Sequence, residues 1–234
     1  TAMVGVGITT YDRWRSRYPG FAARADRAVA RYKGTDPTPV PFDVDFRQRY
    51  FHHDTPAHLQ LLINVINEQV ELARSEQTRD RRVLILLPPE SAKSTLLEEY
   101  LAYRIAMDSS FRSSIVCSTQ AQARKRLGAI SRLLTDRTEY RELVDDFGPF
   151  RSELRSDARP WTANYFTTLR SPAAARDYTC QCLGWTGSIY GDRQDLIACD
   201  DIADLKNQTP AEIDKQWRKL WGEFRSRLVK GGLF

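Results

Sequence analysis

The order in which apolar runs and amphipathic segments alternate constrains the fold of this chain more than any other feature. Residues 83–87 form a short, continuous apolar run, typical of a strand buried on both faces of a parallel sheet. A loop follows, then one helical apolar face, a second strand-like run at residues 115–118 and another helical face over residues 123–134. This alternation predicts an α/β fold with a mostly parallel sheet and right-handed crossovers.

The second half of the chain continues the pattern. Three further strands are predicted there, at residues 165–169, 178–183 and 196–199. Thr209, Pro210 and Glu212 then form a helix-start signature, with a hydroxyl cap, a proline at the first helical position and a capping-box carboxylate. Trp217 and Trp221 follow at helical spacing, which predicts that both lie in the core rather than against bases. The Gly-Gly turn at the end of the sequence is expected to lead into another strand.

The region before the first predicted strand divides into two parts. Residues 1–55 contain an Arg-rich stretch that is predicted to be helical and a linker at residues 35–40 with three prolines in or next to it. From Pro56 onward, apolar residues recur at intervals of three and four, which predicts an amphipathic helix. We therefore expect a helical N-terminal region over residues 1–55 and an α/β domain over residues 56–234.

Composition excludes several classes of protein. The 234 residues are 41% hydrophobic and 28% charged, which is typical of a folded chain and excludes a disordered, collagen-like or coiled-coil protein. No apolar run has the length of a transmembrane helix, so no membrane partner is expected. The net charge of +5 is compatible with a polyanionic partner but does not require one. Buried thiols, rather than disulfides or a zinc site, are expected for the four cysteines, Cys117, Cys180, Cys182 and Cys199.

The loop after the first predicted strand has residues of a phosphate-binding loop. Such loops place backbone N–H groups and the positive end of a helix beside phosphates, while a lysine reaches the outer phosphates and a hydroxyl holds magnesium. Lys93 and Ser94 stand where that geometry requires them, but Leu87 and Ala92 replace the two glycines of the G-x-x-x-x-G-K-[ST] pattern. If Ala92 adopts a left-handed conformation, the cost is about 1–2 kcal/mol, which would weaken nucleotide binding without preventing it.

Two adjacent carboxylates supply the second half of the candidate site. The apolar run 196–199 ends directly in Asp200 and Asp201. In P-loop ATPases a buried strand delivers one carboxylate to magnesium and a neighbouring one to the attacking water. The alternative is that the two aspartates only cap a turn. Their combination with Lys93 and Ser94 favours an ATPase.

Three stretches resemble the ATPase domain of the large terminase subunit, the motor that packages DNA into the capsids of tailed phages and herpesvirus-type viruses. Residues 88–95 resemble the family's deviant Walker A motif with its proline-rich entrance. Residues 161–201 resemble its strands, acidic turn, Gly-rich segment and acidic strand, and residues 218–234 resemble the helix that leads into the strand bearing its coupling motif. The resemblance covers residues 56–234. It implies a P-loop NTPase core of the additional-strand type, in which a further strand separates the P-loop strand from the Walker B strand.

The resemblance also implies a role for each residue of the candidate site. Lys93 would contact phosphate, Ser94 and Asp200 would bind Mg²⁺, and Asp201 would be the catalytic carboxylate. Asp201 is one methylene shorter than the glutamate that is common in such motors, which makes its action on water less secure. The residues expected to bind ATP are Pro89, Glu90, Ser91, Ala92, Lys93, Ser94, Thr95 and Gln60.

For the other candidate functional residues, an explanation without a functional role is also open. Gln60 resembles an adenine-contacting glutamine, although a solvent-facing helix residue would look the same. Arg193 is the candidate arginine finger that stabilises charge in catalysis, against a plain solvated loop arginine. Candidate contacts to DNA phosphates are Arg124, Lys125, Arg126 and Arg132, which lie on or beside one helix, against a solvated helix face.

The function that the resemblance implies is hydrolysis of ATP with Mg²⁺ to drive translocation of double-stranded DNA. The implied partners are a portal protein, a small terminase subunit and neighbouring motor subunits in a homo-oligomeric ring, in the host cytoplasm. The endonuclease domain of the full-length protein would follow Phe234. Two alternatives remain open: a P-loop helicase or translocase acting outside capsid assembly, and a non-hydrolysing DNA-binding assembly module with a degenerate P-loop.

Overall fold

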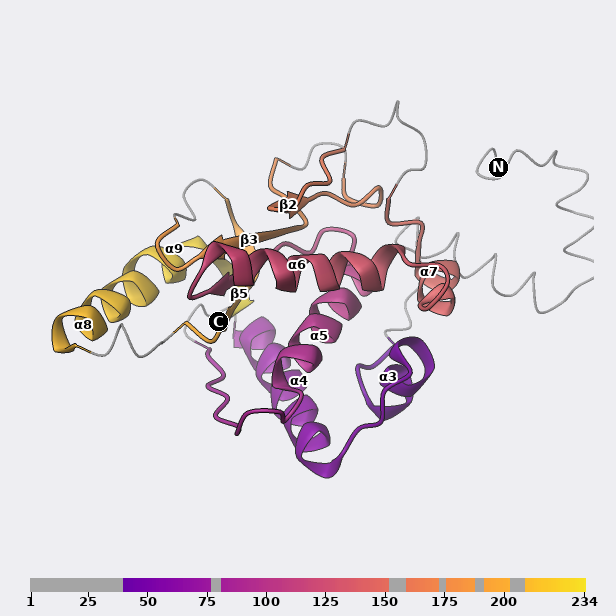
Figure 1. Ribbon diagram of the computed structural model, residues 1–234, viewed down its shortest axis with the longest axis horizontal. Coiled ribbons are helices and arrows are strands. Elements are labelled where there is room, and N and C mark those ends of the chain that lie inside the picture. Colours follow the sequence, from indigo (N-terminus) through magenta and orange to yellow (C-terminus); the bar gives the residue numbers. More distant parts are fainter. Residues whose placement is uncertain (1–39, 77–80, 152–158, 173–175, 188–191, 203–208) are drawn as a thin grey trace, which may run out of the picture.

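The computed structural model describes residues 40–76, 81–151, 159–172, 176–187, 192–202 and 209–234, and its elements follow the predicted alternation (Figure 1). The helices of its first part are α3 (Val44–Phe51), α4 (Ala57–Glu76), α5 (Lys93–Met107), α6 (Gln120–Thr135) and α7 (Arg141–Phe147). The strands are β1 (Ser113–Cys117), β2 (Tyr165–Phe166), β3 (Cys180–Gly184), β4 (Gln194–Asp200) and β5 (Leu228–Leu233). Before β5 lie α8 (Pro210–Arg218), the π-helix η2 (Lys219–Phe224) and the short α9 (Arg225–Arg227).

The five strands form one mixed sheet in the order β2-β3-β1-β4-β5. β1 pairs in parallel with β3 and β4, β4 pairs in parallel with β5, and only β2 is antiparallel to its neighbour. The predicted α/β fold with a mostly parallel sheet is therefore confirmed.

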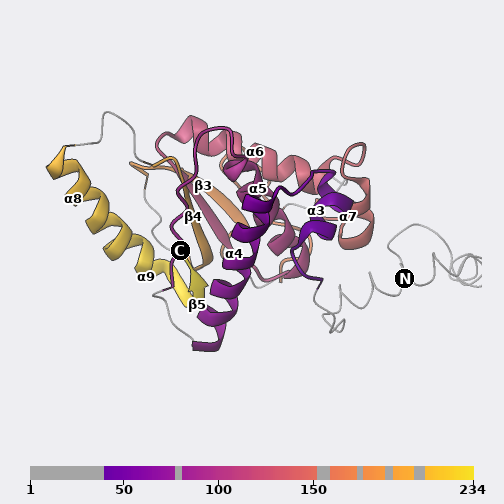
Figure 2. The same ribbon diagram turned by 90° about the horizontal axis from the view of Figure 1, so that it is seen from below.

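Alternate residues of the central strands face two separate cores, as the two-residue period of a strand requires. The larger core lies against α3 to α7 and receives Ile115, Cys117, Cys180, Cys182, Leu196 and Ala198. The smaller core lies on the opposite face and contains Val116, Trp185, Ile197, Phe224 and Leu228. In Figure 2 the strands accordingly run between α4 and the segment that begins with α8. All five residues of β1 are buried because this strand has neighbours on both edges and cover on both faces.

Residues 83–87 correct one prediction, because they form no strand in the described chain and are not buried on both faces. Leu84 and Leu86 are 84% and 82% exposed. The start of this segment nevertheless lies beside the end of β5: the Val83 N–H donates to the Phe234 carbonyl over 3.0 Å, and the Phe234 N–H donates to the Arg81 carbonyl over 3.3 Å. These two bonds have the pattern of a parallel pair. Val83 and Ile85 pack against the larger core, whereas Leu84 and Leu86 face solvent.

The predicted helix start at Thr209 is confirmed, with the Thr209 side chain and the Glu212 carboxylate forming a capping box. The prediction that the next two tryptophans lie in the core is wrong, since Trp217 is 54% and Trp221 is 43% exposed. The π-helical turn explains this outcome: it changes the number of residues per turn, so that Phe224 reaches the core while the tryptophans stack on each other outside it. Arg82 covers the Trp221 ring at 3.5 Å.

The N-terminal part that the structure describes joins the larger core. Phe42, Phe46, Tyr50 and Phe51 are buried in the same cluster as Tyr100 of α5. Residues 1–39 lie outside the described residues, so the division at residue 55 remains a prediction. Among the helices of the described chain, none has both the length and the apolar character needed to cross a membrane.

Candidate active site

The candidate site lies where the start of α5 meets the carboxyl end of β4. β4 ends at Asp200, which is in register with Cys117 at the end of β1, and Asp201 follows directly. Because α5 begins at Lys93, its first backbone N–H groups have no partner within the helix and carry the positive end of the helix dipole. The carboxyl ends of parallel strands are the usual place for ligands in open α/β sheets.

The loop before α5 has the left-handed backbone conformation whose cost the sequence analysis considered for Ala92. Ala92, the residue before the helix, is left-handed with φ 58° and ψ 19°, and Glu90 also has a positive φ of 64°. Left-handed residues next to a helix start turn successive N–H groups toward one concave space, which is the geometry of anion-binding loops. The methyl group of alanine makes this conformation costly, so Ala92 is strained at a position where glycine would not be.

We predict that Ala92→Gly stabilises the protein. Removing the Cβ relieves the left-handed strain, and the greater freedom of glycine in the unfolded chain offsets part of the gain, so the free energy of unfolding should rise by about 1 kcal/mol. Urea denaturation measures the change. Ala129→Gly within α6 is the matched control and should lower the stability by a similar amount, since that alanine has helical geometry. A loss of stability in Ala92→Gly would contradict the strain.

The four residues expected to act on phosphate, metal and water come together. The Ser94 hydroxyl donates to Oδ1 of Asp200 over 3.1 Å, although the two residues are 106 positions apart. Nζ of Lys93 lies 3.8 Å from Oδ1 of Asp201. Asp200 is buried, whereas the Asp201 side chain is mostly exposed on a residue with φ 48°. One carboxylate is thus fixed beside the hydroxyl, and the other faces the solvent beside the lysine.

Arg126 of α6 also belongs to this site, whereas the sequence analysis gave it only as a candidate contact to DNA. Its Nε lies 2.8 Å from Oδ2 of Asp200, and its Nη1 donates to Oε1 of Glu98 over 3.0 Å. Burial raises the pKa of the Glu98 carboxyl, and the hydrogen bond from Arg126 opposes that rise. The sequence does contain a signal that Arg126 points inward. Arg126 lies three residues after Ala123 and four before Ile130, and both of these residues are on the buried stripe of α6.

The remaining residues expected to bind nucleotide surround this centre at the start of α4 and in the loop. Nε2 of His58 lies 3.4 Å from the Ser91 carbonyl, which brings the start of α4 against the loop, and Gln60 is exposed on that first turn. Pro89 is exposed in the turn, and Thr95 is half-buried on α5. The buried Ser91 hydroxyl has no hydrogen-bond partner in the described part of the chain.

Arg193 lies away from the other candidate residues. It directly precedes β4, and its Nη1 donates to the carbonyl of Ser226 over 3.0 Å. β4 has 7 residues, and at about 3.3 Å per residue it separates Arg193 from Asp200 by roughly 20 Å. Arg193 therefore does not reach Lys93 within one chain.

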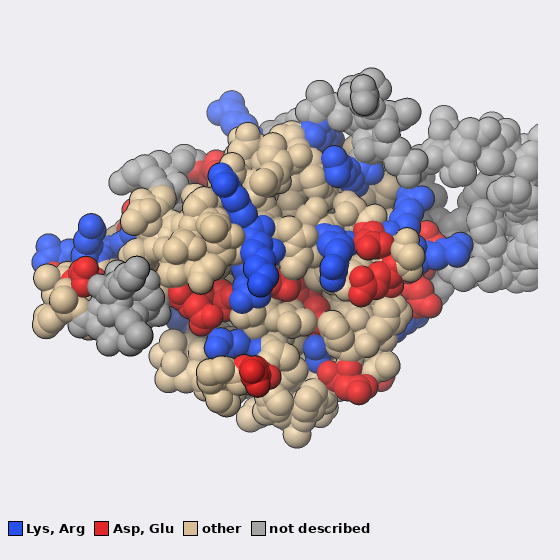
Figure 3. Space-filling model, viewed as in Figure 1, with Lys and Arg blue, Asp and Glu red and all other residues tan. Residues whose placement is uncertain are grey.

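The other basic side chains of α6 are exposed, and Figure 3 shows Lys and Arg crossing the surface in that region with acidic side chains nearby. Arg124 donates through Nε to Oδ1 of Asn164 over 2.8 Å. Nη2 of Arg132 lies 3.9 Å from Oε2 of Glu139, and Lys125 is exposed. These contacts leave open both a solvated helix face and a face that binds phosphates.

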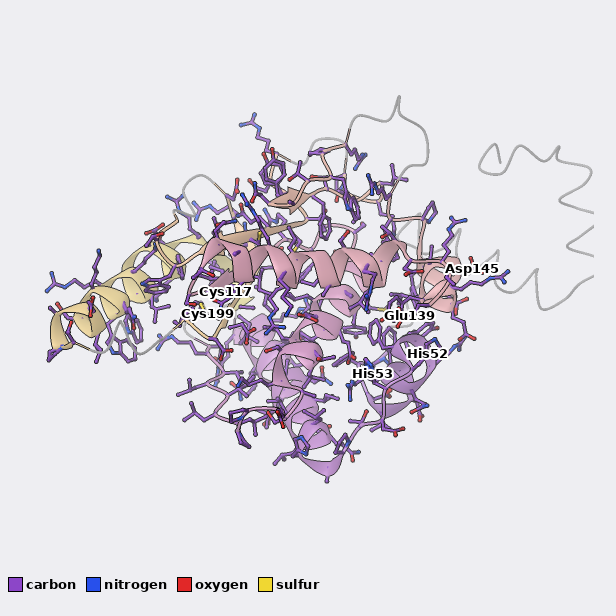
Figure 4. All side chains as sticks on the ribbon, viewed as in Figure 1. His52, His53, Cys117, Glu139, Asp145 and Cys199 are labelled. Carbon is purple, nitrogen blue, oxygen red and sulfur yellow. The ribbon has the colours of Figure 1, made fainter. Side chains whose placement is uncertain are left out.

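Three of the four cysteines, Cys117, Cys180 and Cys182, are buried thiols as predicted, and Cys199 is half-buried. All four are free, and Figure 4 labels Cys117 and Cys199 on the neighbouring strands β1 and β4. Burial raises the pKa of the Cys117 thiol to about 12, with the nearby Asp200 carboxylate adding to the rise. Such thiols stay protonated and do not bind metal readily. No group of three His, Cys, Asp or Glu side chains that could hold a metal occurs within the described ranges.

Comparison with known proteins found no family model and no curated sequence that matches this chain.

Proposed function

We propose that this chain is the ATPase motor domain of a viral large terminase, which hydrolyses ATP to drive double-stranded DNA into a procapsid. The observation that carries the proposal is the convergence of Lys93 and Ser94, from the start of α5, with Asp200 and Asp201 at the end of β4. A lysine and a hydroxyl beside two strand-end carboxylates are the groups that phosphoryl transfer to water uses.

The strand order supports a P-loop core of the additional-strand type. The segment that leads into the loop pairs at its start with the end of β5, and β5 pairs on its other side with β4. β5 therefore lies between the segment before Lys93 and the strand that ends in Asp200, as the additional strand of that fold does. β5 also follows directly on the helical segment that resembles the approach to the coupling motif.

The residues present fit a magnesium ion bound together with ATP. Magnesium in such sites prefers oxygen ligands, uses one or two protein groups and keeps waters and substrate phosphates as the others. Ser94 Oγ and Asp200 Oδ1 are two such oxygens, 3.1 Å apart. The ion would neutralise charge on the phosphates. Lys93 would contact those phosphates, and Asp201, the more exposed carboxylate, would orient the attacking water.

The wider assignment follows from the same proposal. The partners would be double-stranded DNA, a portal protein, a small terminase subunit and further copies of the motor in a homo-oligomeric ring, in the host cytoplasm. The full-length protein would also be an endonuclease, through residues outside this chain. Arg193, about 20 Å from its own Asp200, would act as arginine finger only on the site of a neighbouring subunit.

Calorimetric titration with ATP, with and without Mg²⁺, tests the proposal. The wild-type chain should bind ATP more tightly with Mg²⁺, and Ser94→Ala should lose most of that metal dependence. Lys125→Ala, which removes an exposed lysine on α6, is the control and should bind like wild type. The left-handed Ala92 favours one alternative, a non-hydrolysing assembly module. Absence of ATP binding under both conditions would support that alternative against the motor.

Binding of DNA by the α6 face has its own signature. If Arg124, Lys125 and Arg132 neutralise phosphates, binding should be independent of sequence and should weaken steeply with salt, because each contact releases counterions. Changing all three to glutamine should reduce the slope of log affinity against log salt by about 2–3. Fluorescence anisotropy with a labelled duplex measures the slope. If the slope is the same in the variant, these residues do not contact DNA phosphates and only form a solvated helix face.

A further inference from the structure

One guanidinium joins the candidate metal carboxylate to the helix of the loop. Arg126 contacts Oδ2 of Asp200 through Nε at 2.8 Å and Oε1 of Glu98 through Nη1 at 3.0 Å. Ser94 donates to the other oxygen of Asp200, Oδ1. The two oxygens of this carboxylate therefore have different partners, a cation from α6 on one and a hydroxyl from α5 on the other.

The guanidinium of Arg126 fixes the positions of the Asp200 and Glu98 carboxylates relative to each other. The guanidinium is planar, so the directions of its N–H groups are fixed relative to one another and the position of one carboxylate sets that of the other. Asp200 and Glu98 are both buried, which leaves Arg126 as the cation that compensates two carboxylates withdrawn from water. Arg126 thus determines which way the Asp200 carboxylate turns.

We propose that Arg126 is a positioning residue that makes Asp200 a one-oxygen ligand and thereby selects magnesium over calcium. The inference rests on the proposed function, because it concerns the metal that accompanies ATP. Arg126 already engages Oδ2, so Oδ1, beside the Ser94 hydroxyl, would be the oxygen left for the metal.

The chemistry of the two ions makes this distinction useful. Magnesium requires near-octahedral geometry at 2.0–2.1 Å and takes carboxylates through single oxygens, whereas calcium takes six to eight ligands and accepts both oxygens of one carboxylate. A carboxylate with one oxygen already engaged suits the smaller ion. A carboxylate with both oxygens available gives calcium an extra ligand and gives magnesium nothing comparable.

The experiment measures binding of a non-hydrolysable ATP analogue by calorimetry, once with Mg²⁺ and once with Ca²⁺. In Arg126→Gln the preference for Mg²⁺ over Ca²⁺ should fall by about tenfold, within the range typical of groups that orient metal ligands. Arg126→Lys keeps one cationic donor and should restore part of the preference. A purely structural role would weaken binding with both ions equally and leave their ratio unchanged, which would overturn the inference.

Arg124→Gln is the matched control. Arg124 lies on the same helix two positions away, but its Nε contacts Asn164 rather than a carboxylate of the site. The ratio of Mg²⁺ to Ca²⁺ binding should therefore stay at its wild-type value in this variant. A ratio that falls as far in Arg124→Gln as in Arg126→Gln would trace the effect to the charge of the helix and would also overturn the inference.

Glu98→Gln provides an independent variant if Arg126→Gln does not fold. Glutamine keeps a carbonyl acceptor for Arg126 but removes the competing charge, so Arg126 should be drawn more strongly to Asp200. The preference for Mg²⁺ over Ca²⁺ should then rise above its wild-type value, and a ratio that stays at the wild-type value would count against the inference. If wild type binds the analogue with neither ion, the proposed function fails and this inference fails with it. If wild type binds and only the variants disagree, the proposed function stands.

Discussion

Asp201→Asn should reduce ATP hydrolysis by roughly 10²-fold or more while nucleotide binding stays intact, because a residue that orients water acts mainly in the transition state. The structure sharpens the expectation for binding. Lys93 lies 3.8 Å from Asp201, and the asparagine variant removes a carboxylate that competes with phosphate for the lysine. Affinity for ATP should therefore be equal to that of wild type or higher. Steady-state hydrolysis in the assembled motor, paired with calorimetry on the isolated chain, measures both effects.

Lys93→Ala is the contrasting variant. Lys93 would pair with phosphate already in the ground state, so its loss should weaken binding and abolish turnover together. The assembled motor is the proper setting for hydrolysis, since Arg193 could reach an active site only in a neighbouring subunit. Normal hydrolysis by Asp201→Asn in that setting, with loss of hydrolysis in Asp200→Asn, would assign the water to a carboxylate other than Asp201.

The proximity of the candidate residues at the end of β4 could be predicted because it depends on local rules. A buried apolar run ending in Asp200, together with a Lys-Ser pair at the start of a helix, requires only that parallel strands carry their carboxyl ends to one edge. The sequence analysis considered a left-handed Ala92 only as a condition, and the structure has that conformation at a position where glycine usually supplies the turn.

The features that the sequence analysis did not predict depend mainly on contacts between segments far apart in the chain. Arg126 was grouped with the other basic residues of its helix, because the sequence does not reveal that a buried carboxylate from β4 faces that position. The exposure of Leu84 depends on which segments lie beside residues 83–87, and the exposure of Trp217 depends on a π-helical turn for which the sequence has no clear signature.

The helix that carries Lys93 and Ser94 is also anchored to the N-terminal part of the chain. Arg47 of α3 donates through Nε to Oε2 of Glu99 on α5 over 2.6 Å, and the two side chains are each 1% exposed. Nη1 of Arg47 also donates to the carbonyl of Asp54 and the hydroxyl of Thr55, and Oε1 of Glu99 contacts His53. The pair is therefore fully bonded inside the protein, which is the condition under which a buried ion pair is tolerated.

Arg47→Met should lower the free energy of unfolding by about 3–5 kcal/mol, because it leaves the Glu99 carboxylate buried without its cation. The double variant Arg47→Met, Glu99→Leu should recover most of that loss, since it removes both charges and fills the space with apolar groups. Urea denaturation measures the free energy of unfolding of wild type, Arg47→Met and the double variant. Arg141→Ala is the control: Arg141 forms an exposed pair with Asp145 on α7, and its removal should change stability little. A double variant as unstable as Arg47→Met would show that packing of the arginine stem, rather than the unpaired charge, anchors α3 to α5.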